Sequence, residues 1–429
     1  MQTTPVSHEK FLKTINNQLF IVLLLMVACF FTWSENVSIT RAIKVVGRMG
    51  VMISSFLIYQ KIIRYGSVNS LTYKNIFSPI LYMAYLTLGF ISFSWSTNAG
   101  FSALQWFMTF QSFVFAYFFV KSLKILDIYF EGHTIRLYHL LGNVVFILQL
   151  VFVIGMWISP DVFFRLTDGG EEARLGGTFM NPNELGMLAG VGCACLIFDL
   201  YGFKNKVWTT IKILIIMYAL YMTGSRSSLI GVLLIIFFHV NQTKRKTLKF
   251  GIIAVVAAIA PFAVYTIILK GGDQSRLEEV MSLTGRLPFW KALITEGLPR
   301  EPLLGFGFMR IDYKEFFQSA HTYPGKMTHN TFMQVLMNLG FIGFTIILFQ
   351  VFFTLKSILS EQKEIKLMLI GILIPIIINS FTEFGIFGES NYGIMFYQII
   401  IFSIAFRNNN HLTRMQKIIL SKKRPDLDF

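Results

Sequence analysis

Four polar positions stand out in a chain that is otherwise strongly apolar. Three are arginines, Arg174, Arg226 and Arg286, each in a short polar segment next to apolar runs, and the fourth is His329, followed by Asn330. A guanidinium can bind a diphosphate through two parallel hydrogen bonds, and a histidine can take a proton from a hydroxyl near neutral pH. These residue types together predict a reaction in which cations hold a phosphate leaving group while His329 activates a hydroxyl nucleophile.

The segments around these positions predict how each side chain is placed. Arg174 precedes a Gly-Gly pair and an Asn-Pro-Asn turn that ends at Asn183, which is typical of a helix start. Arg226 follows a tight turn between two apolar runs, and Arg286 leads a segment with Trp290 that suits a helix lying at the membrane interface. Each feature also has a structural interpretation, as a solvated arginine, an arginine on lipid phosphates or a packed tryptophan.

The elements that must position these residues are membrane helices. The 429 residues are 54% hydrophobic and only 14% charged, which lies outside the range of soluble domains and predicts an all-α polytopic membrane protein. Apolar runs of suitable length indicate about twelve transmembrane helices. The predicted spans are 19–33, 42–59, 76–95, 102–120, 138–158, 183–201, 207–222, 227–240, 250–269, 330–355, 365–381 and 390–406.

The distribution of lysine and arginine predicts the orientation of these spans. If the N-terminus is cytoplasmic, every second connection is rich in cations, as the positive-inside rule requires. The short outer connections hold only four arginines: Arg41, Arg165, Arg174 and Arg226. The net charge of +15 is therefore interpreted as membrane topology and not as nucleic-acid binding. Both termini are expected in the cytoplasm.

The predicted organisation has five parts. They are a cytoplasmic N-terminal segment 1–18, transmembrane helices 1–9 over 19–269 with the outer loop 159–182, a large periplasmic loop 270–329, transmembrane helices 10–12 over 330–406, and a basic cytoplasmic tail 407–429. No phosphate-binding Gly-rich motif is present, and the three cysteines lie inside apolar runs as expected for buried thiols. The sequence therefore predicts neither a cofactor nor a metal centre.

In their order along the chain, these motifs resemble those of the O-antigen ligase and polysaccharide polymerase family of bacterial envelope glycosyltransferases. The resemblance covers roughly residues 174–389. It rests on Gly-Thr-Phe-x-Asn-Pro-Asn-Glu, Ser225-Arg226, Gly285-Arg286 with Trp290, Pro302 to Gly307, and His329-Asn330 followed, after nine intervening residues, by Gly340-x-x-Gly343.

The resemblance implies a GT-C-like architecture in the bacterial inner membrane and a metal-independent glycosyltransferase that uses an undecaprenyl-diphosphate-linked glycan as donor. By position, His329 matches the proposed catalytic histidine of the family. Arg226 and Arg286 match its diphosphate-binding arginines, with Arg174 as a third. In our interpretation, three further residues support these groups: Asn330, Asn183 and Trp290. The implied partners are membrane lipids, a glycan or lipid A core acceptor and a chain-length regulator.

The sequence motifs are compatible with two branches of the family, the polymerases and the ligases. Arg-x10-Gly patterns described for polymerases occur at Arg165 and again at Arg286, while His-Asn-x9-Gly-x-x-Gly is associated with ligases and also found in related polymerases. We interpret the chain as a polymerase of lipid-linked repeat units, with an O-antigen ligase as the alternative. A glycolipid transporter is a further alternative, but its polar sites would be expected at mid-membrane. A metal-dependent transferase would need acidic residues in the first outer loop, where only Glu35 occurs.

Overall fold

The computed structural model describes residues 5–66, 71, 73–130, 132–133, 135–167, 172–200, 206–242, 247, 249–251, 253–254, 258, 286–308, 328–383 and 385–406. The predicted span 250–269 and the predicted loop 270–329 fall mostly outside these residues, and the predicted tail 407–429 lies entirely outside them.

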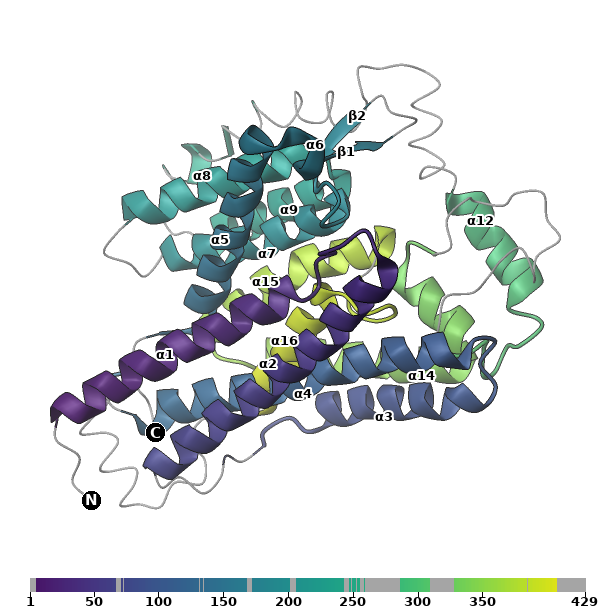
Figure 1. Cartoon of the computed structure of the whole chain (residues 1–429), viewed down its shortest axis with the longest axis horizontal. Helices are drawn as coiled ribbons and strands as arrows, with labels where there is room; N and C mark the ends of the chain where they lie inside the picture. The colour runs from purple at the N-terminus through teal and green to yellow at the C-terminus, as the bar shows by residue number, and fades with distance from the viewer. Residues whose placement is uncertain are drawn as a thin grey trace.

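Within the described residues the protein is a bundle of helices (Figure 1). Its long helices are α1 (Pro5–Ala28), α2 (Val37–Gly66), α3 (Phe77–Ile91), α4 (Ala99–Tyr129), α5 (Leu137–Ile158), α7 (Pro182–Leu200), α8 (Lys206–Thr223), α14 (Thr331–Leu359) and α15 (Lys363–Thr382). Two shorter apolar helices are α9 (Arg226–Gln242) and α16 (Tyr392–Ala405). In this part of the chain nine helical segments are long and apolar enough to cross a membrane, which confirms the all-α polytopic membrane fold.

Several helices extend beyond the spans predicted from hydropathy. Helix α1 begins at Pro5, inside the segment predicted as 1–18, and α4 covers Ala99–Tyr129 where the prediction was 102–120. Apolar runs locate the part of a helix that suits the membrane, whereas backbone hydrogen bonding continues into polar turns. At the start of α4, the side chain of Asn98 caps the helix by accepting from Phe101 N at 3.0 Å.

Small residues bring α7 into close contact with its neighbours. A β-carbon on Gly186 would lie 2.7 Å from Ser228 Oγ of α9, and one on Gly190 would lie 2.8 Å from the side chain of Pro375 in α15. Such positions let helix backbones approach closely inside a membrane. Helix α16 is buried along its whole length, so these two helices form much of the interior.

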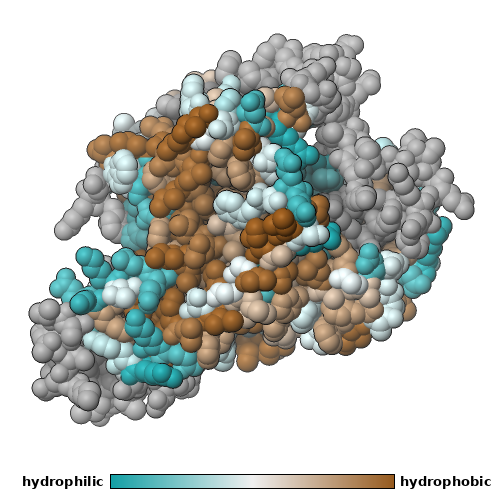
Figure 2. All heavy atoms as spheres, viewed as in Figure 1, coloured by the Kyte–Doolittle hydropathy of each residue, from teal (hydrophilic) through white to brown (hydrophobic). Residues whose placement is uncertain are grey.

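The connections alternate between two ends of the bundle. At one end, Thr32 N donates to Phe179 O at 2.7 Å, which joins the α1–α2 connection to the segment before α7. At the opposite end, Lys74 N donates to Ala405 O at 2.7 Å, and Lys74 Nζ pairs with Glu361 at 2.8 Å. Figure 2 shows apolar residues across the middle of the visible face, between polar patches towards the lower left and the upper right. We call the end with Phe179 the site end.

A small β-hairpin at the site end was not predicted. Strands β1 (Phe164–Thr167) and β2 (Glu172–Leu175) follow the single helical turn α6 (Pro160–Phe163) and pair antiparallel, with Arg165 opposite Arg174. These strands of four residues are too short for a clear alternating pattern, which explains why the sequence did not indicate them.

Helix α14 is interrupted where the sequence has Gly340. This glycine has φ +61°, and the segment 302–307 packs beside it. Phe341 N donates to Pro302 O at 2.8 Å, and Gly307 N donates to Asn338 O at 2.8 Å. The glycine-rich segment therefore satisfies backbone groups that the interruption releases, as a membrane protein requires. Two motifs that are far apart in the sequence thus form one structural unit.

Candidate active site

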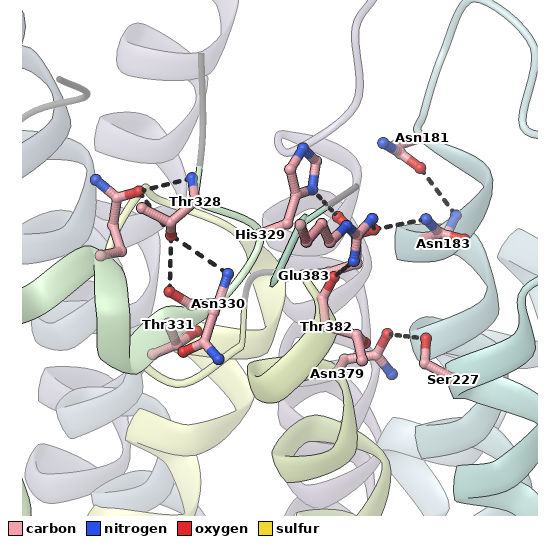
Figure 3. A network of polar contacts seen from close by, with 12 residues as sticks. Asn181, Asn183, Ser227, Thr328, His329, Asn330, Thr331, Asn379, Thr382 and Glu383 are labelled. Atoms are coloured by element: carbon pink, nitrogen blue, oxygen red, sulfur yellow. Dashed lines mark hydrogen bonds and ion pairs between the residues drawn. The ribbon is translucent and has the colours of Figure 1, made fainter. Parts of the chain in front are cut away.

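The carboxylate of Glu383 lies at the centre of a polar network at the site end (Figure 3). Glu383 follows the last residue of α15 and its side chain is only 8% exposed. Its Oε2 contacts Nδ1 of His329 at 2.7 Å, and its Oε1 accepts from Arg286 Nη2 at 2.7 Å and from Asn183 Nδ2 at 2.8 Å. One buried carboxylate therefore joins three segments that the sequence separates widely.

Asn183 extends this network to Arg174. Arg174 Nη2 donates to Asn183 Oδ1 at 2.7 Å, and Arg174 Nε donates to Thr223 O at 2.7 Å. Gly224 has φ +58°, and a β-carbon there would lie 3.2 Å from Arg174 Nε, so a glycine gives the turn before α9 both its conformation and its space. Arg174 and Asn183 thus connect the hairpin, the start of α7 and the α8–α9 turn to Glu383.

His329 occupies a constrained backbone position. Its φ of 49° is the only positive value at a non-glycine residue in the described part of the chain. Asn330 follows it and caps α14, because its Oδ1 accepts from Phe332 N at 2.9 Å and from Met333 N at 3.1 Å. Asn330 Nδ2 also donates to Phe381 O at 3.2 Å, two residues before Glu383. The same asparagine therefore fixes the backbone of His329 against the end of α15, which offsets the cost of the left-handed conformation.

Trp290 fixes α12 (Arg286–Ala292) against the start of α14. Its Nε1 donates to Thr328 O at 2.7 Å, directly before His329. The neighbouring Phe289 is buried with Leu293 in a small apolar cluster beside α14. Arg286, at the start of this helix, is thereby held within reach of Glu383.

The guanidinium of Arg286 makes two contacts with the end of α15. Its Nη1 donates to Thr382 O, and its Nη2 donates to Glu383. Its Nε is buried and has no hydrogen-bond partner among the described residues. A buried donor without a partner is costly, so Nε is available for a ligand.

Arg226 is placed near the network by the residue that follows it. It is the first residue of α9 and its side chain is half-buried. The next residue, Ser227, donates through Oγ to Asn379 Oδ1 at 3.1 Å, and Asn379 is one helical turn before Glu383 on α15. The start of α9 is therefore directed towards the same region, where a helix N-terminus favours an anion.

The charge state of Glu383 determines where the proton between Glu383 and His329 lies. Burial raises the pKa of its carboxyl, but the hydrogen bonds and charges of His329 and Arg286 outweigh this effect and hold the pKa below the ordinary value of 4.5. An ionised carboxylate only accepts hydrogen bonds, so the shared proton belongs to Nδ1 of His329. In neutral His329 the basic lone pair is then on Nε2, and in Figure 3 this ring nitrogen points away from Glu383.

Sequence reasoning missed Glu383. It identified three arginines and a histidine without an acidic partner, although Thr382-Glu383 follows directly after the predicted span 365–381. An acidic residue at the edge of an apolar run was the available signal, because ionisable groups there are usually retained for function. Of the predicted site residues, the structure brings His329, Arg286, Asn183 and Arg174 into one bonded network, with Asn330 and Trp290 supporting it.

The geometry brings a histidine with an orienting carboxylate together with arginines on several elements, an arrangement suited to transfer chemistry on a phosphorylated substrate. Residues 211–348 match the family model described as O-Antigen ligase. This match confirms the predicted resemblance to the O-antigen ligase and polymerase family. The matched residues include Arg226, Arg286 and His329, whereas Arg174 and Glu383 lie outside them. No curated protein matches the chain.

The candidate ligands for a metal ion are the His, Cys, Asp and Glu side chains of the described part of the chain. Within the ranges that the structure describes, no group of three His, Cys, Asp or Glu side chains is placed to hold a metal ion. The three cysteines are buried and free: Cys29, Cys193 and Cys195. The absence of a metal in the reaction stays a prediction.

Proposed function

We propose that this protein is a glycosyltransferase of the periplasmic face of the bacterial inner membrane. It polymerises undecaprenyl-diphosphate-linked repeat units into O-antigen, capsule or exopolysaccharide. The observation that carries this proposal is the 2.7 Å contact between His329 and Glu383, which is joined by hydrogen bonds to arginines of two different elements, α12 and β2. The family match supports transfer of a lipid-linked glycan in general.

In the proposed reaction, His329 is the general base. A hydroxyl of the acceptor gives its proton to Nε2 as its oxygen forms a bond to the anomeric carbon of the donor glycan. Glu383 accepts from Nδ1–H, which fixes the tautomer and stabilises the imidazolium that forms. The constrained backbone at His329 adds to this positioning, since a base must lie within hydrogen-bonding distance of the proton that it removes.

The arginines act on the leaving group. The bond between the anomeric carbon and the phosphate oxygen breaks, and undecaprenyl diphosphate departs with the bonding electrons. Nε of Arg286 and the half-buried Arg226 at the start of α9 are the groups that bind this diphosphate. Arg174 is held by Thr223 and Asn183, so it contributes positive charge from a fixed position.

This function requires the site end to face the periplasm, with both termini in the cytoplasm. The distribution of cations in the sequence supports that orientation. The partners are then the lipid-linked donor, membrane lipids, a second lipid-linked glycan as acceptor and a chain-length regulator.

An O-antigen ligase is the second candidate, because the family model that matches the chain carries that description. The same site would then transfer the glycan to the lipid A core. Deletion of the gene distinguishes the two functions through the lipopolysaccharide. Core capped with a single repeat unit indicates a lost polymerase, while uncapped core with accumulated lipid-linked polymer indicates a lost ligase.

The proposed mechanism is tested by replacing His329 with Ala. The variant should insert at normal abundance and make neither polymer nor capped core, because no other group in the network is placed to take the proton from the acceptor. Arg226→Lys should also impair transfer, since a lysine cannot make the planar two-pronged contact with a diphosphate. Normal product from the His329→Ala variant at equal abundance would refute the mechanism.

A further inference from the structure

A polar cavity lies at the site end, and most of its lining comes from the α1–α2 connection, α2 and α4, which carry none of the motifs described above. Its volume is about 510 Å³, within the range of small-molecule sites. It is lined by residues of the α1–α2 connection, of α2 and α4, of the segment before α7 and of the segment before α16. We call it the Arg48 cavity after the buried arginine in its wall.

Three cations of α2 line this cavity. Arg41, Lys44 and Arg48 recur at intervals of three and four residues, which places them on one face of the helix. Arg41 is exposed, whereas Arg48 is only 1% exposed. Cations that line a cavity at the end of a membrane bundle are costly and indicate a function.

Arg48 lacks the partner that a buried cation normally has. Its Nη1 donates to Ser390 Oγ at 2.7 Å, and its guanidinium carbon lies 3.7 Å from the centre of the Phe30 ring. Its Nε is buried and without a hydrogen-bond partner, and no ion pair joins Arg48 to a carboxylate within the described ranges. A hydroxyl and a ring compensate a buried charge only in part, so an anion in the cavity would stabilise Arg48.

The carboxylates of the cavity do not remove its positive character. Glu389 accepts from Gln105 Nε2 at 3.1 Å, and Glu35 is exposed at the rim. The lining therefore contains two carboxylates and the three cations of α2. The cavity is suited to an anionic group near Arg48.

The rest of the lining suits a sugar ring. Trp33 and Phe179 line the cavity with partly exposed rings, and Phe101 lies under the guanidinium of Arg41 at 5.8 Å. Aromatic faces provide an apolar platform for the C–H face of a sugar, whereas the amide of Gln105 is already bonded to Glu389 and to Ser390 N. A saccharide that carries an anionic group would use both the rings and the cations of α2.

Two segments of the chain that line the cavity also carry residues of the proposed active site. Ser390 and Glu389 follow Glu383 in the same short segment, and six residues of extended chain span at most about 22 Å. Thr178, which also lines the cavity, comes four residues after Arg174. A glycan of a few sugar units can therefore extend from one site to the other.

We propose that the Arg48 cavity binds an anionic sugar unit, carrying a carboxylate or a phosphate, in the acceptor glycan. Binding there holds the acceptor while its reactive hydroxyl reaches His329. The assignment to the acceptor rests on the proposed function, whereas binding of an anionic sugar by Arg48 does not.

Binding is measured on the full-length protein in lipid nanodiscs with three probes: methyl β-glucuronide, glucose 1-phosphate and methyl β-glucoside. The two charged probes distinguish a carboxylate from a phosphate as the preferred anion, and at least one should bind about tenfold more tightly than the neutral glycoside, because it gains a charge-assisted hydrogen bond. Arg48→Met should remove this preference, while Arg48→Lys should retain part of it. Equal affinity for charged and neutral probes, or an unchanged preference in Arg48→Met, overturns the proposal.

A second variant keeps the test valid if Arg48→Met does not fold. Arg41→Gln changes an exposed position, and it should weaken binding of the charged probes without affecting the thermal stability. In a transfer assay Arg41→Gln should raise the KM for an acidic acceptor and leave kcat at saturating acceptor unchanged. An unchanged affinity and KM in this variant count against the cavity as an anionic-sugar site.

The His329→Ala variant separates this inference from the proposed function. It should bind the charged probes as the wild type does and fail to transfer glycan. Transfer that persists in His329→Ala, together with loss of binding in Arg48→Met, would overturn the proposed function and leave the cavity assignment standing. Loss of transfer in His329→Ala, together with unchanged binding in Arg48→Met, would overturn only the cavity assignment.

Discussion

Among the described residues, close histidine–carboxylate pairs occur at both ends of the bundle. They are His329–Glu383, His139–Asp199 and His133–Asp127, and the first two have the shortest distances. At the site end, Nδ1 of His329 lies 2.7 Å from Glu383, and at the opposite end Nε2 of His139 lies 2.8 Å from Asp199. Both histidines are largely buried, with side chains 17% and 16% exposed. By distance and burial alone, the two pairs are alike.

Their surroundings differ. Nδ1 of His139 accepts from the backbone N of Arg136 at 3.2 Å, as part of the cap at the start of α5, so both of its ring nitrogens are held by its own fold. His329 uses Nδ1 for its carboxylate, and its other nitrogen points away from Glu383. The two pairs therefore differ in their neighbours: Glu383 is also bonded to Arg286 and Asn183, whereas the ring of His139 belongs to a helix cap.

The largest difference between the two pairs is expected when the carboxylate of each is replaced by an amide. Glu383→Gln should lower the initial rate of glycan transfer by about 10²–10⁴-fold, because an amide stabilises neither the Nδ1–H tautomer nor the imidazolium. Asp199→Asn should leave the rate close to that of the wild type. Both rates are measured on purified protein in nanodiscs. A comparable loss of rate in the two variants would show that the difference between the ends has no catalytic meaning.

The arginines that accompany the two ends provide a second test. Arg286→Lys should lower the rate of transfer by about 10–100-fold, since a lysine cannot contact Thr382 and Glu383 together and retain a donor for the diphosphate. Arg136, which pairs with Asp127 at 2.9 Å at the opposite end, is the matched control. Arg136→Lys should preserve the rate, and a rate that is equal in both variants contradicts the role of Arg286.

The depressed pKa of Glu383 predicts how stability depends on pH. A carboxyl whose pKa is lower in the folded state stabilises the fold above its unfolded pKa, near 4.5, and loses this contribution as the pH falls through the lower folded value. The thermal unfolding midpoint should therefore drop at pH values below 4.5. Glu383→Gln should show a smaller drop over the same pH range, as measured by thermal unfolding in nanodiscs. An identical pH profile in both proteins would argue against an ionised, stabilising Glu383.

The smallest expected effect concerns the caps that hold the two helices at the site end. Asn330→Ala and Asn98→Ala each remove a side-chain cap, from α14 and α4 respectively, at a cost of about 1 kcal/mol in stability. Only Asn330→Ala should also lower transfer, because Asn330 fixes His329 against Phe381. The stability is measured by thermal unfolding and the rate in the transfer assay. Equal losses of rate would mean that the cap of α14 has no special link to catalysis.

The sequence predicted much of the fold because membrane helices can be recognised from their apolar composition. Apolar runs located every described helix of the bundle except the short α6 and α12, although Arg286 and Trp290 indicated the latter. The β-hairpin around Arg174 was missed because its strands are short, and the interruption of α14 was not inferred although Gly340 was noticed in a motif. Edges were displaced because hydropathy reports the membrane part of a helix and not its hydrogen-bonded ends.

For the candidate site, the sequence supplied the residues that are unusual in their local setting. His329 and the arginines are polar groups at the edges of apolar runs, and the cost of such positions can be seen without coordinates. The roles of Glu383 and Arg48 were not inferred. Glu383 is a single charge at the end of one apolar run and Arg48 lies inside another, and neither has a partner in the local sequence.

By itself, the sequence determined that this is a helical membrane protein, where its described membrane helices lie in the chain and which polar residues adjoin them. These properties follow from local composition and from the high cost of placing charge in a membrane. Only the tertiary structure decided that Glu383 pairs with His329 and that Arg48 faces a cavity beside Ser390. Such pairings depend on the packing of helices that are distant in the chain, and side-chain hydrogen bonds act over about 3 Å, so no local pattern specifies them.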